Sequence, residues 1–199
     1  PTMSRGLGDV YKRQGIHGVE GFAGSAIQLS VIDMLKNQKL IEDYCIIFVH
    51  IINPFGMAWH RRVNENNVDM NRNFINTHSG EPDGYKKIDK FLNPNTIPKK
   101  FELSFYIDGI KLILKYGFTN FKQWFAQGQY TRPSSLQYGG DKLQKGPKLL
   151  IDWLRKNLKE TQMIFGIDLH TGLGKYGYDT ILISYQINEV DYKLLKNLY

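Results

Sequence analysis

Short apolar, β-branched runs alternate along this chain with longer amphipathic segments, and that alternation constrains the fold most. The runs at 44–52 and 163–168 end at turn-forming residues, so each predicts a buried strand. A third strand is predicted at 180–185. Strands that alternate with helices indicate a layered α/β sheet, here in a single domain. Helices are predicted at 21–40, 106–116, 120–127, 147–158 and 188–199.

Composition narrows the class of protein. The chain has 199 residues, 42% of them apolar, and a single cysteine, which excludes a disordered chain and a disulfide scaffold. The net charge is +7, but the cations are spread along the chain, so we expect no nucleic-acid partner. No apolar run is long enough to cross a bilayer and no signal peptide is visible, so no membrane partner is expected. The cytoplasm is favoured as the compartment, and the oligomeric state is left open.

The first fourteen residues look foreign to the rest of the chain. They show no apolar periodicity and no helix or strand signal, and residues 9–14 resemble the translation of a transposon end used in sequencing libraries. Such a segment is excluded from fold reasoning. We therefore divide the chain into a non-native translated adapter at 1–14 and a partial domain at 15–199. The adapter is expected to pack poorly against the domain.

A His-x-x-Glu pair near the start of the domain offers two metal ligands. His17 and Glu20 fall on one side of a single turn, so both can reach one ion. A catalytic zinc site needs three such donors at roughly 2 Å and one open position. His170 stands just past a predicted strand, where α/β sheets place ligands, and Asp168 is a candidate to orient the site. Taken alone, the His-x-x-Glu pair fits an ordinary surface turn better than a metal site.

A polar, arginine-rich loop follows the first predicted strand. Arginine suits the bidentate binding of a carboxylate or the polarising of a carbonyl. Ordering several arginines and asparagines in a loop requires a ligand or core contacts to hold them. The alternative is that the arginines only tie the loop down through backbone hydrogen bonds. The segments concerned are Asn53-Pro54-Phe55-Gly56, Trp59, Arg61-Arg62-Val63-Asn64 and Val68-Asp69-Met70-Asn71-Arg72-Asn73-Phe74.

Together these motifs resemble the zinc carboxypeptidase (carboxypeptidase A-like) superfamily. The shared marks are His-x-x-Glu at 17–20, Asn-Pro-x-Gly at 53–56, Asp-x-Asn-Arg-Asn-Phe at 69–74 and the later His170, in that order. The fit looks closest to an uncharacterised, mainly bacterial branch, a domain of unknown function, with His-Gly-x-Glu-Gly and Asp-Leu-His-Thr-Gly motifs. The resemblance implies a zinc-exopeptidase-like, three-layer α/β/α fold around a mixed central sheet, here incomplete.

The resemblance also assigns a metal site. His17, Glu20 and His170 match the family's ligands for one Zn²⁺ ion, so their donor atoms should converge within roughly 4 Å. In this chemistry zinc acts as a Lewis acid and lowers the pKa of a bound water. The resemblance therefore implies a metallocarboxypeptidase that removes C-terminal residues from peptides.

Substrate-binding residues follow from the same likeness. Asn71 and Arg72 match the pair that grips the terminal carboxylate of a substrate. Arg61 best matches the arginine that polarises the scissile carbonyl, and Arg62 is a close competitor. These arginines are expected to point into the same cleft as the metal site.

A general-base glutamate is not identified in this chain. The family places it on a late strand beyond the third ligand, whereas only Glu189 follows His170 here, in a polar turn. We expect the chain as given to bind metal but to be inactive. Two alternatives stay open. One is a zinc-dependent deacylase or amidohydrolase of N-acyl amino acids, of the aspartoacylase or succinylglutamate desuccinylase type, and the other is a binding homologue without catalysis.

Overall fold

The computed structural model divides into two compact units, residues 1–169 and 170–199. It describes residues 9–13, 15–36, 45–77, 80–97, 99–162, 164–172, 177, 178, 189 and 193. The first unit holds the sheet and all the helices for which bounds are given below. In the second unit, Glu189 and Lys193 are helical and form an ion pair at 3.1 Å. None of the helices among the described residues combines the length and the hydropathy needed to cross a membrane.

The sheet has three strands in the order β2-β1-β3. Strand β1 (Asp9–Arg13) lies in the middle, between β2 (Ile46–Val49) and β3 (Ile164–Asp168). Both pairings are parallel, so the described residues form a partial α/β fold. They contain no antiparallel pairing of the kind that the expected mixed sheet requires. The strand predicted at 180–185 lies outside the described residues.

Strand β1 corrects the expectation of poor packing for residues 9–13, the part of the segment 1–14 that the structure describes. Val10 pairs with Ile46 on one side and with Phe165 on the other, so this segment forms the centre of the sheet. A strand between two parallel neighbours is held by main-chain hydrogen bonds, which any residue except proline can make. Val10 and Tyr11 also favour extended backbone. The origin of the segment as a translated adapter stays a prediction.

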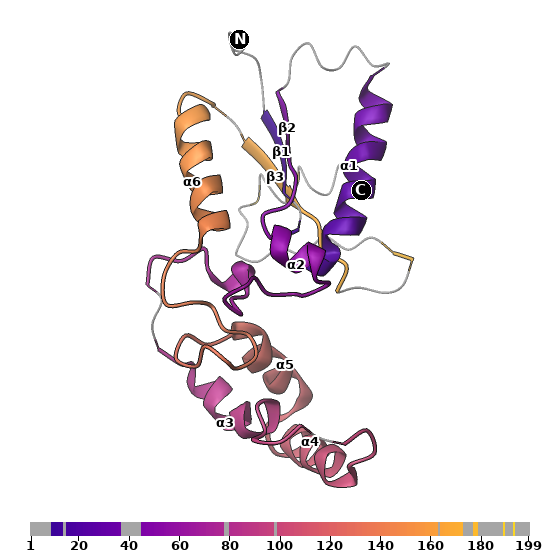
Figure 1. The fold of residues 1–199 in the computed structure, drawn as a ribbon, viewed down its shortest axis with the longest axis vertical. Helices are drawn as coiled ribbons and strands as arrows, with labels where there is room; N and C mark the ends of the chain where they lie inside the picture. The colour runs from indigo at the N-terminus through magenta and orange to yellow at the C-terminus, as the bar shows by residue number, and fades with distance from the viewer. Residues whose placement is uncertain are drawn as a thin grey trace. The chain divides into compact units, whose positions relative to one another are not determined.

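Two long helices lie on either side of the strands in Figure 1. They are α1 (Gly21–Leu35) and α6 (Lys145–Asn157). Helix α1 ends five residues earlier than predicted, and residues 37–44 lie outside the described ranges. Side chains of α6 and of the loops at the strand ends share one buried cluster, which joins this helix to the sheet. Its members are Ile16, Ile52, Met70 and Leu150, with Ile47, Val49, Phe74 and Leu154 packed around them.

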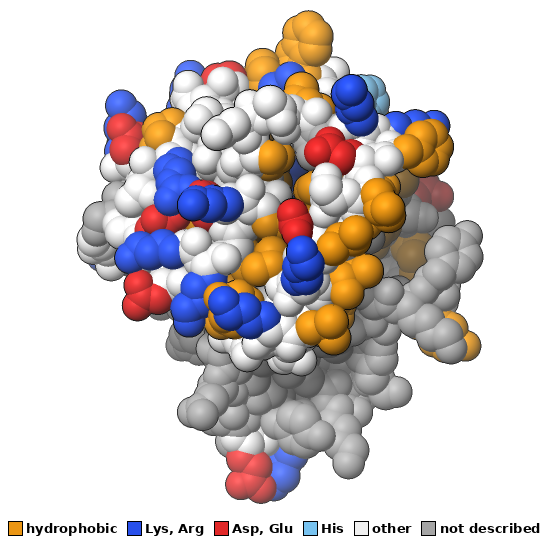
Figure 2. All heavy atoms as spheres, turned by 90° about the horizontal axis from the view of Figure 1, so that it is seen from below, with side chains coloured by type: hydrophobic (Ala, Val, Ile, Leu, Met, Phe, Trp, Pro, Cys, Tyr) orange, Lys and Arg blue, Asp and Glu red, His pale blue; other side chains and the backbone are white. Residues whose placement is uncertain are grey.

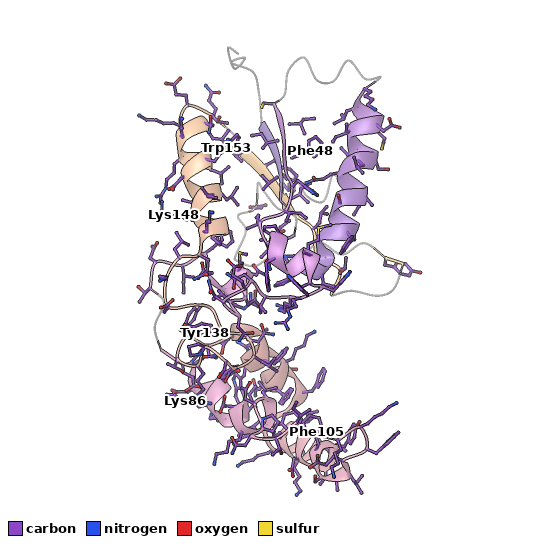
Figure 3. All side chains as sticks on the ribbon, in the orientation of Figure 1. Phe48, Lys86, Phe105, Tyr138, Lys148 and Trp153 are labelled. Carbon is purple, nitrogen blue, oxygen red and sulfur yellow. The ribbon has the colours of Figure 1, made fainter. Side chains whose placement is uncertain are left out.

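Three further helices pack on one another. They are α3 (Asp83–Leu92), α4 (Leu103–Tyr116) and α5 (Phe118–Gln127). Phe91 of α3 stacks on Phe105 of α4, with ring centroids 4.6 Å apart. Figure 3 shows Phe105 within this group. Helices α4 and α5 correspond to the helices predicted at 106–116 and 120–127, and Gly117 separates them as expected. Helix α3 was not predicted.

The polar loop that follows β2 contains short helices and is held by residues 128–144. Buried Asn73 donates to the carbonyls of Gly139 and Lys142, both at 2.8 Å, and accepts from the backbone N–H of Gln144. Buried Asn64 donates to the side chain of Gln144 at 2.9 Å. Core contacts therefore hold these asparagines. The short helices of this region and of the preceding turn are η1 (Gly18–Glu20), α2 (Pro54–Ala58) and η3 (Met70–Arg72).

Candidate metal centre

A close contact between η1 and α2 builds the turn that carries the first two candidate ligands. A Cβ on Gly18 would lie 2.1 Å from the carbonyl carbon of Gly56, so a side chain here would collide with the backbone of α2. Asn53 caps α2 by accepting from the N–H of Gly56 at 2.8 Å. Its amide donates to the carbonyl of Ile16, next to His17, at 3.4 Å. The His-Gly and Asn-Pro-x-Gly motifs thus fix the position of His17 together.

The three predicted ligands come together. The donor atoms of His17, Glu20 and His170 all lie within 4.8 Å of one another, somewhat wider than the 4 Å expected. His17 Nδ1 and Glu20 Oε2 are 3.2 Å apart, and His17 is buried whereas Glu20 is of intermediate burial. His170 is exposed and follows β3 by two residues. Among the described residues, this is a group that could hold a metal ion.

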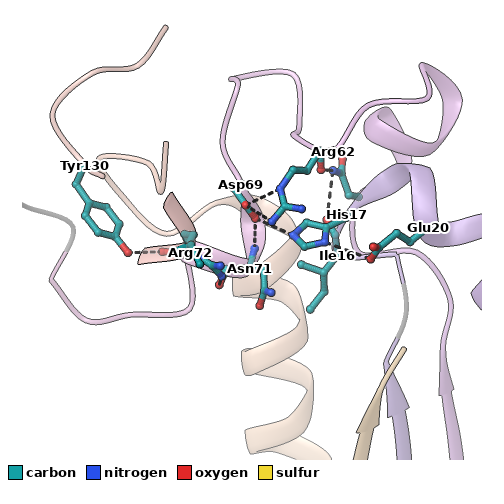
Figure 4. Close-up of polar contacts among 10 residues, drawn as sticks. Ile16, His17, Glu20, Arg62, Asp69, Asn71, Arg72 and Tyr130 are labelled. Carbon is teal, nitrogen blue, oxygen red and sulfur yellow. Dashed lines mark hydrogen bonds and ion pairs between the residues drawn. The ribbon is translucent and has the colours of Figure 1, made fainter. Parts of the chain in front are cut away.

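Asp69 connects the candidate ligands to the arginine-rich loop (Figure 4). It is fully buried at the start of η3. Its Oδ1 lies 3.1 Å from His17 Nε2 and accepts from the N–H of Asn71 at 2.9 Å. Its Oδ2 accepts from Nε and Nη2 of Arg62, both at 2.9 Å. Because Nε2 of His17 faces Asp69, Nδ1 is the ring nitrogen left to face Glu20 and an ion.

The hydrogen bonds in this cluster shift the pKa of both partners. Burial by itself lowers the pKa of His17, but the bonds to Asp69 and Glu20 outweigh it, and the pKa rises above 6.5. Burial by itself raises the pKa of Asp69, but the bond to His17 and the charges of His17 and Arg62 lower it to about 2. Asp69 is therefore a carboxylate at neutral pH, and it stabilises positive charge on His17.

Arg61 and Arg62 occupy different environments although they are adjacent. Arg62 is exposed, with 43% of its side chain accessible, but its guanidinium binds the buried Asp69. Arg61 is exposed, and within the described ranges its side chain has no polar partner. Its backbone carbonyl accepts from the N–H of Val19 at 3.1 Å and so supports the ligand turn. Of the two, Arg61 has the guanidinium that is free to meet a ligand.

Asn71 and Arg72 lie in η3, beside Asp69. Arg72 donates from Nε to the carbonyl of Ala126 at the end of α5, at 2.6 Å, and from Nη1 to the carbonyl of Asn71. The hydroxyl of Tyr130 in turn donates to the carbonyl of Arg72 at 2.8 Å. Part of the Arg72 guanidinium therefore ties the loop down through backbone hydrogen bonds, which is the alternative to ligand binding considered for these arginines. Its charge still reaches Asp69, whose pKa it helps to lower.

Comparison with known proteins gives one match. The family model described as a protein of unknown function (DUF2817) matches residues 10–199. The chain belongs to the DUF2817 family. No curated protein matches. No solved structure matches either.

The DUF2817 match includes residues 10–13, which are most of β1, together with every residue of the candidate metal centre. It agrees with the expectation of an uncharacterised branch. The wider resemblance to zinc carboxypeptidases is not part of the match.

Sequence reasoning missed one residue of this site. Asp69 was quoted within a motif but was assigned no role. It is one of two carboxylates in the asparagine-rich loop, with Glu65, and the one that lies two residues before Asn71. The pairing with His17 spans 52 positions, which no local pattern can indicate.

Proposed function

We propose that this chain carries the metal site of a zinc-dependent metallohydrolase of carboxypeptidase type, within a three-layer α/β/α fold around a mixed sheet. The observation that supports this most is the convergence of His17, Glu20 and His170. Two imidazoles and one carboxylate are a donor set of catalytic zinc sites, and they leave one position open. When bound, zinc supplies a Lewis acid and lowers the pKa of a water molecule.

The residues around the ligands fit the same proposal. Metal-binding histidines usually donate their other ring N–H to a carboxylate, which fixes the ring and raises its basicity. Asp69 stands in that position relative to His17. An ordinary surface turn does not explain this contact well, because the contact buries a carboxylate and an imidazole together. The donor set and its support therefore favour zinc.

Substrate contacts are proposed for the arginines and for Asn71. Arg61 is proposed to polarise the scissile carbonyl, because Arg62 is held by Asp69. Asn71 and Arg72 are proposed to bind the terminal carboxylate, with the tethers of Arg72 to backbone carbonyls holding its guanidinium in place. Glu189 is exposed and paired with Lys193 on its own helix, so it is given no role.

The first test is zinc stoichiometry, measured by elemental analysis after dialysis against zinc and then against buffer. The chain should retain one zinc ion, and His17→Ala, Glu20→Ala and His170→Ala should each lose most of it. His60→Ala is the matched control, because this exposed histidine stacks on Phe22 and belongs to no donor group among the described residues. Retention of zinc by all three ligand variants would contradict the proposal.

The second test distinguishes peptide from N-acyl substrates. A panel of peptides with free or amidated C-termini, and of N-acetyl and N-succinyl amino acids, is given to this chain and to another DUF2817 member. The second protein is needed because no glutamate of the present chain is assigned as general base. Release of C-terminal residues only from free C-termini supports a carboxypeptidase. Release of acetate or succinate without peptide trimming would replace it by a deacylase.

A further inference from the structure

Helix α5 ends against the side chain of Arg72. The Nε of Arg72 donates to the carbonyl of Ala126, in the last turn of this helix, at 2.6 Å. The last carbonyls of a helix lack partners within the helix and carry its negative end, so they suit a guanidinium. Nη1 donates to the carbonyl of Asn71 at 3.1 Å, and Nη2 has no hydrogen-bond partner among the described residues. These contacts hold the guanidinium and leave Nη2 open to a ligand.

Gly128, the residue directly after α5, makes room for the stem of this arginine. It has a φ of 76° and a ψ of −173°, a combination that is essentially restricted to glycine. A Cβ here would lie 3.2 Å and 3.3 Å from Cγ and Cδ of Arg72, and 2.8 Å from the carbonyl oxygen of Gln137. A larger residue would therefore have to displace Arg72 or the backbone at 137.

Tyr130, two residues later, holds the backbone of Arg72. Its hydroxyl donates to the carbonyl of Arg72 at 2.8 Å, as Figure 4 shows. Its ring packs on Gly139, where a Cβ would lie 2.1 Å from Cε1 of the ring. Between the two, Gln129 is fully buried, and its side-chain oxygen accepts from the backbone N–H groups of the next two residues. The turn at 128–130 thus fixes Arg72 at its backbone as well as along its side chain.

The charges on the neighbouring helices are mixed, so they offer a carboxylate little net attraction. On α3, Lys86 pairs with Asp83 at 3.1 Å, and on α4, Lys111 pairs with Asp108 at 3.4 Å. Figure 2 shows acidic side chains among the lysines and arginines of the face that it draws. Binding of a carboxylate beside these helices therefore depends on N–H groups held at hydrogen-bond distance, which a fixed arginine supplies.

We propose that Tyr130 and Gly128 are positioning residues, which set the preference of the site for a free C-terminal carboxylate by fixing Arg72. This inference rests on the proposed function, in which Arg72 binds that carboxylate. An arginine held at its carbonyl, its stem and its Nε loses little further rotamer freedom when a ligand binds. The affinity for a carboxylate should then depend on the turn at 128–130, which acts through Arg72.

Peptide binding tests the role of Tyr130. A dansylated tripeptide of alanine, with a free or an amidated C-terminus, is titrated into the full chain with zinc present and followed by fluorescence. Tyr130→Phe keeps the ring but removes the hydrogen bond, so it should weaken binding of the free peptide about three- to tenfold and leave the amidated peptide unchanged. Tyr85→Phe is the matched control, because it removes a hydrogen bond of the same kind, to the carbonyl of Leu136 at 2.7 Å. It should leave both affinities unchanged.

Gly128→Ala tests the space for the arginine stem by the same titration. The preference for the free peptide should fall, because the added Cβ would displace Arg72. Gly117→Ala is the control, since Gly117 also has a positive φ, of 81°, but a Cβ there would meet nothing within 4 Å. Both substitutions strain the backbone, and only the first crowds Arg72. An equal loss of preference in the two variants would count against the positioning role.

Arg72→Ala separates a failure of this inference from a failure of the proposed function. An original chain that binds the free and the amidated peptide equally would remove the carboxylate anchor, and the positioning role with it. If the original chain prefers the free peptide, Arg72→Ala should abolish that preference. A Tyr130→Phe variant that then keeps the full preference, as Tyr85→Phe is expected to do, would overturn the positioning role and leave the proposed function standing.

Discussion

Asp69 shows how one carboxylate can serve both the fold and a metal site. It is fully buried, yet both its oxygens are used, by His17, by Arg62 and by the backbone of Asn71. A buried charge is costly unless it is paired and hydrogen-bonded. The three partners satisfy that condition, and they also fix which nitrogen of His17 faces Glu20.

Replacing the Asp69 carboxylate should therefore weaken zinc binding. Asp69→Asn is expected to weaken zinc binding about 10- to 100-fold, because an amide orients and polarises the His17 ring less well than a carboxylate. Competition with a chromophoric chelator measures the affinity. Asp152→Asn, which disrupts only an exposed pair with Lys148, should leave it unchanged. Equal zinc affinity of the two variants would remove Asp69 from the site.

The two adjacent arginines should differ in their effect on stability. Arg62→Ala leaves Asp69 buried without its guanidinium partner and is expected to lower the free energy of unfolding by about 1–3 kcal/mol. Arg61→Ala removes an exposed side chain and should change it by less than about 0.5 kcal/mol. Urea unfolding of the metal-free chain gives both values. A larger loss for Arg61 than for Arg62 would reverse the roles proposed for them.

At the scale of elements, the approach of η1 to α2 depends on glycine. Gly18→Ala is expected to destabilise the chain by roughly 1–3 kcal/mol and to weaken zinc binding, because a Cβ would meet the backbone of Gly56. Gly21→Ala is the matched control, since its Cβ would meet the flexible end of Met57 at 3.1 Å. Thermal unfolding with and without zinc separates the two effects. A Gly18→Ala variant as stable as the control would show that the turn can move.

Most elements could be predicted from residue patterns, because their signals are local. Apolar runs and their spacing predict strands β2 and β3 and helices α4, α5 and α6. Helix α3 was missed, although Tyr85 and Ile88 are fully buried three positions apart, because lysines separate them. Strand β1 was missed because its pairing depends on two distant strands. The three candidate ligands could be predicted from the resemblance to a known family. The contact of His17 with Asp69 could not, because it forms only in the folded structure.

For the molecule as a whole, β1 is expected to be needed for folding through its backbone. Tyr11→Pro should abolish cooperative thermal unfolding, because proline removes a main-chain donor from a central strand. Tyr11→Thr keeps that donor and a high preference for extended backbone, so it should retain a cooperative transition. Circular dichroism against temperature compares the two. A proline variant that unfolds like the original chain would show that residues 9–13 do not form the central strand.

The pairing of β1 with β3 also sets the order of events during synthesis. Asp9 lies opposite Ile164 in the sheet, so the central strand is made first and its second neighbour is made last. At about 5–20 residues per second, a ribosome takes on the order of ten seconds or more to span that interval. During that time the nascent chain exposes one side of β1, and the sheet closes only after most contacts of lower sequence separation have formed. We therefore expect a chain with this strand order to depend on chaperones more than its size suggests.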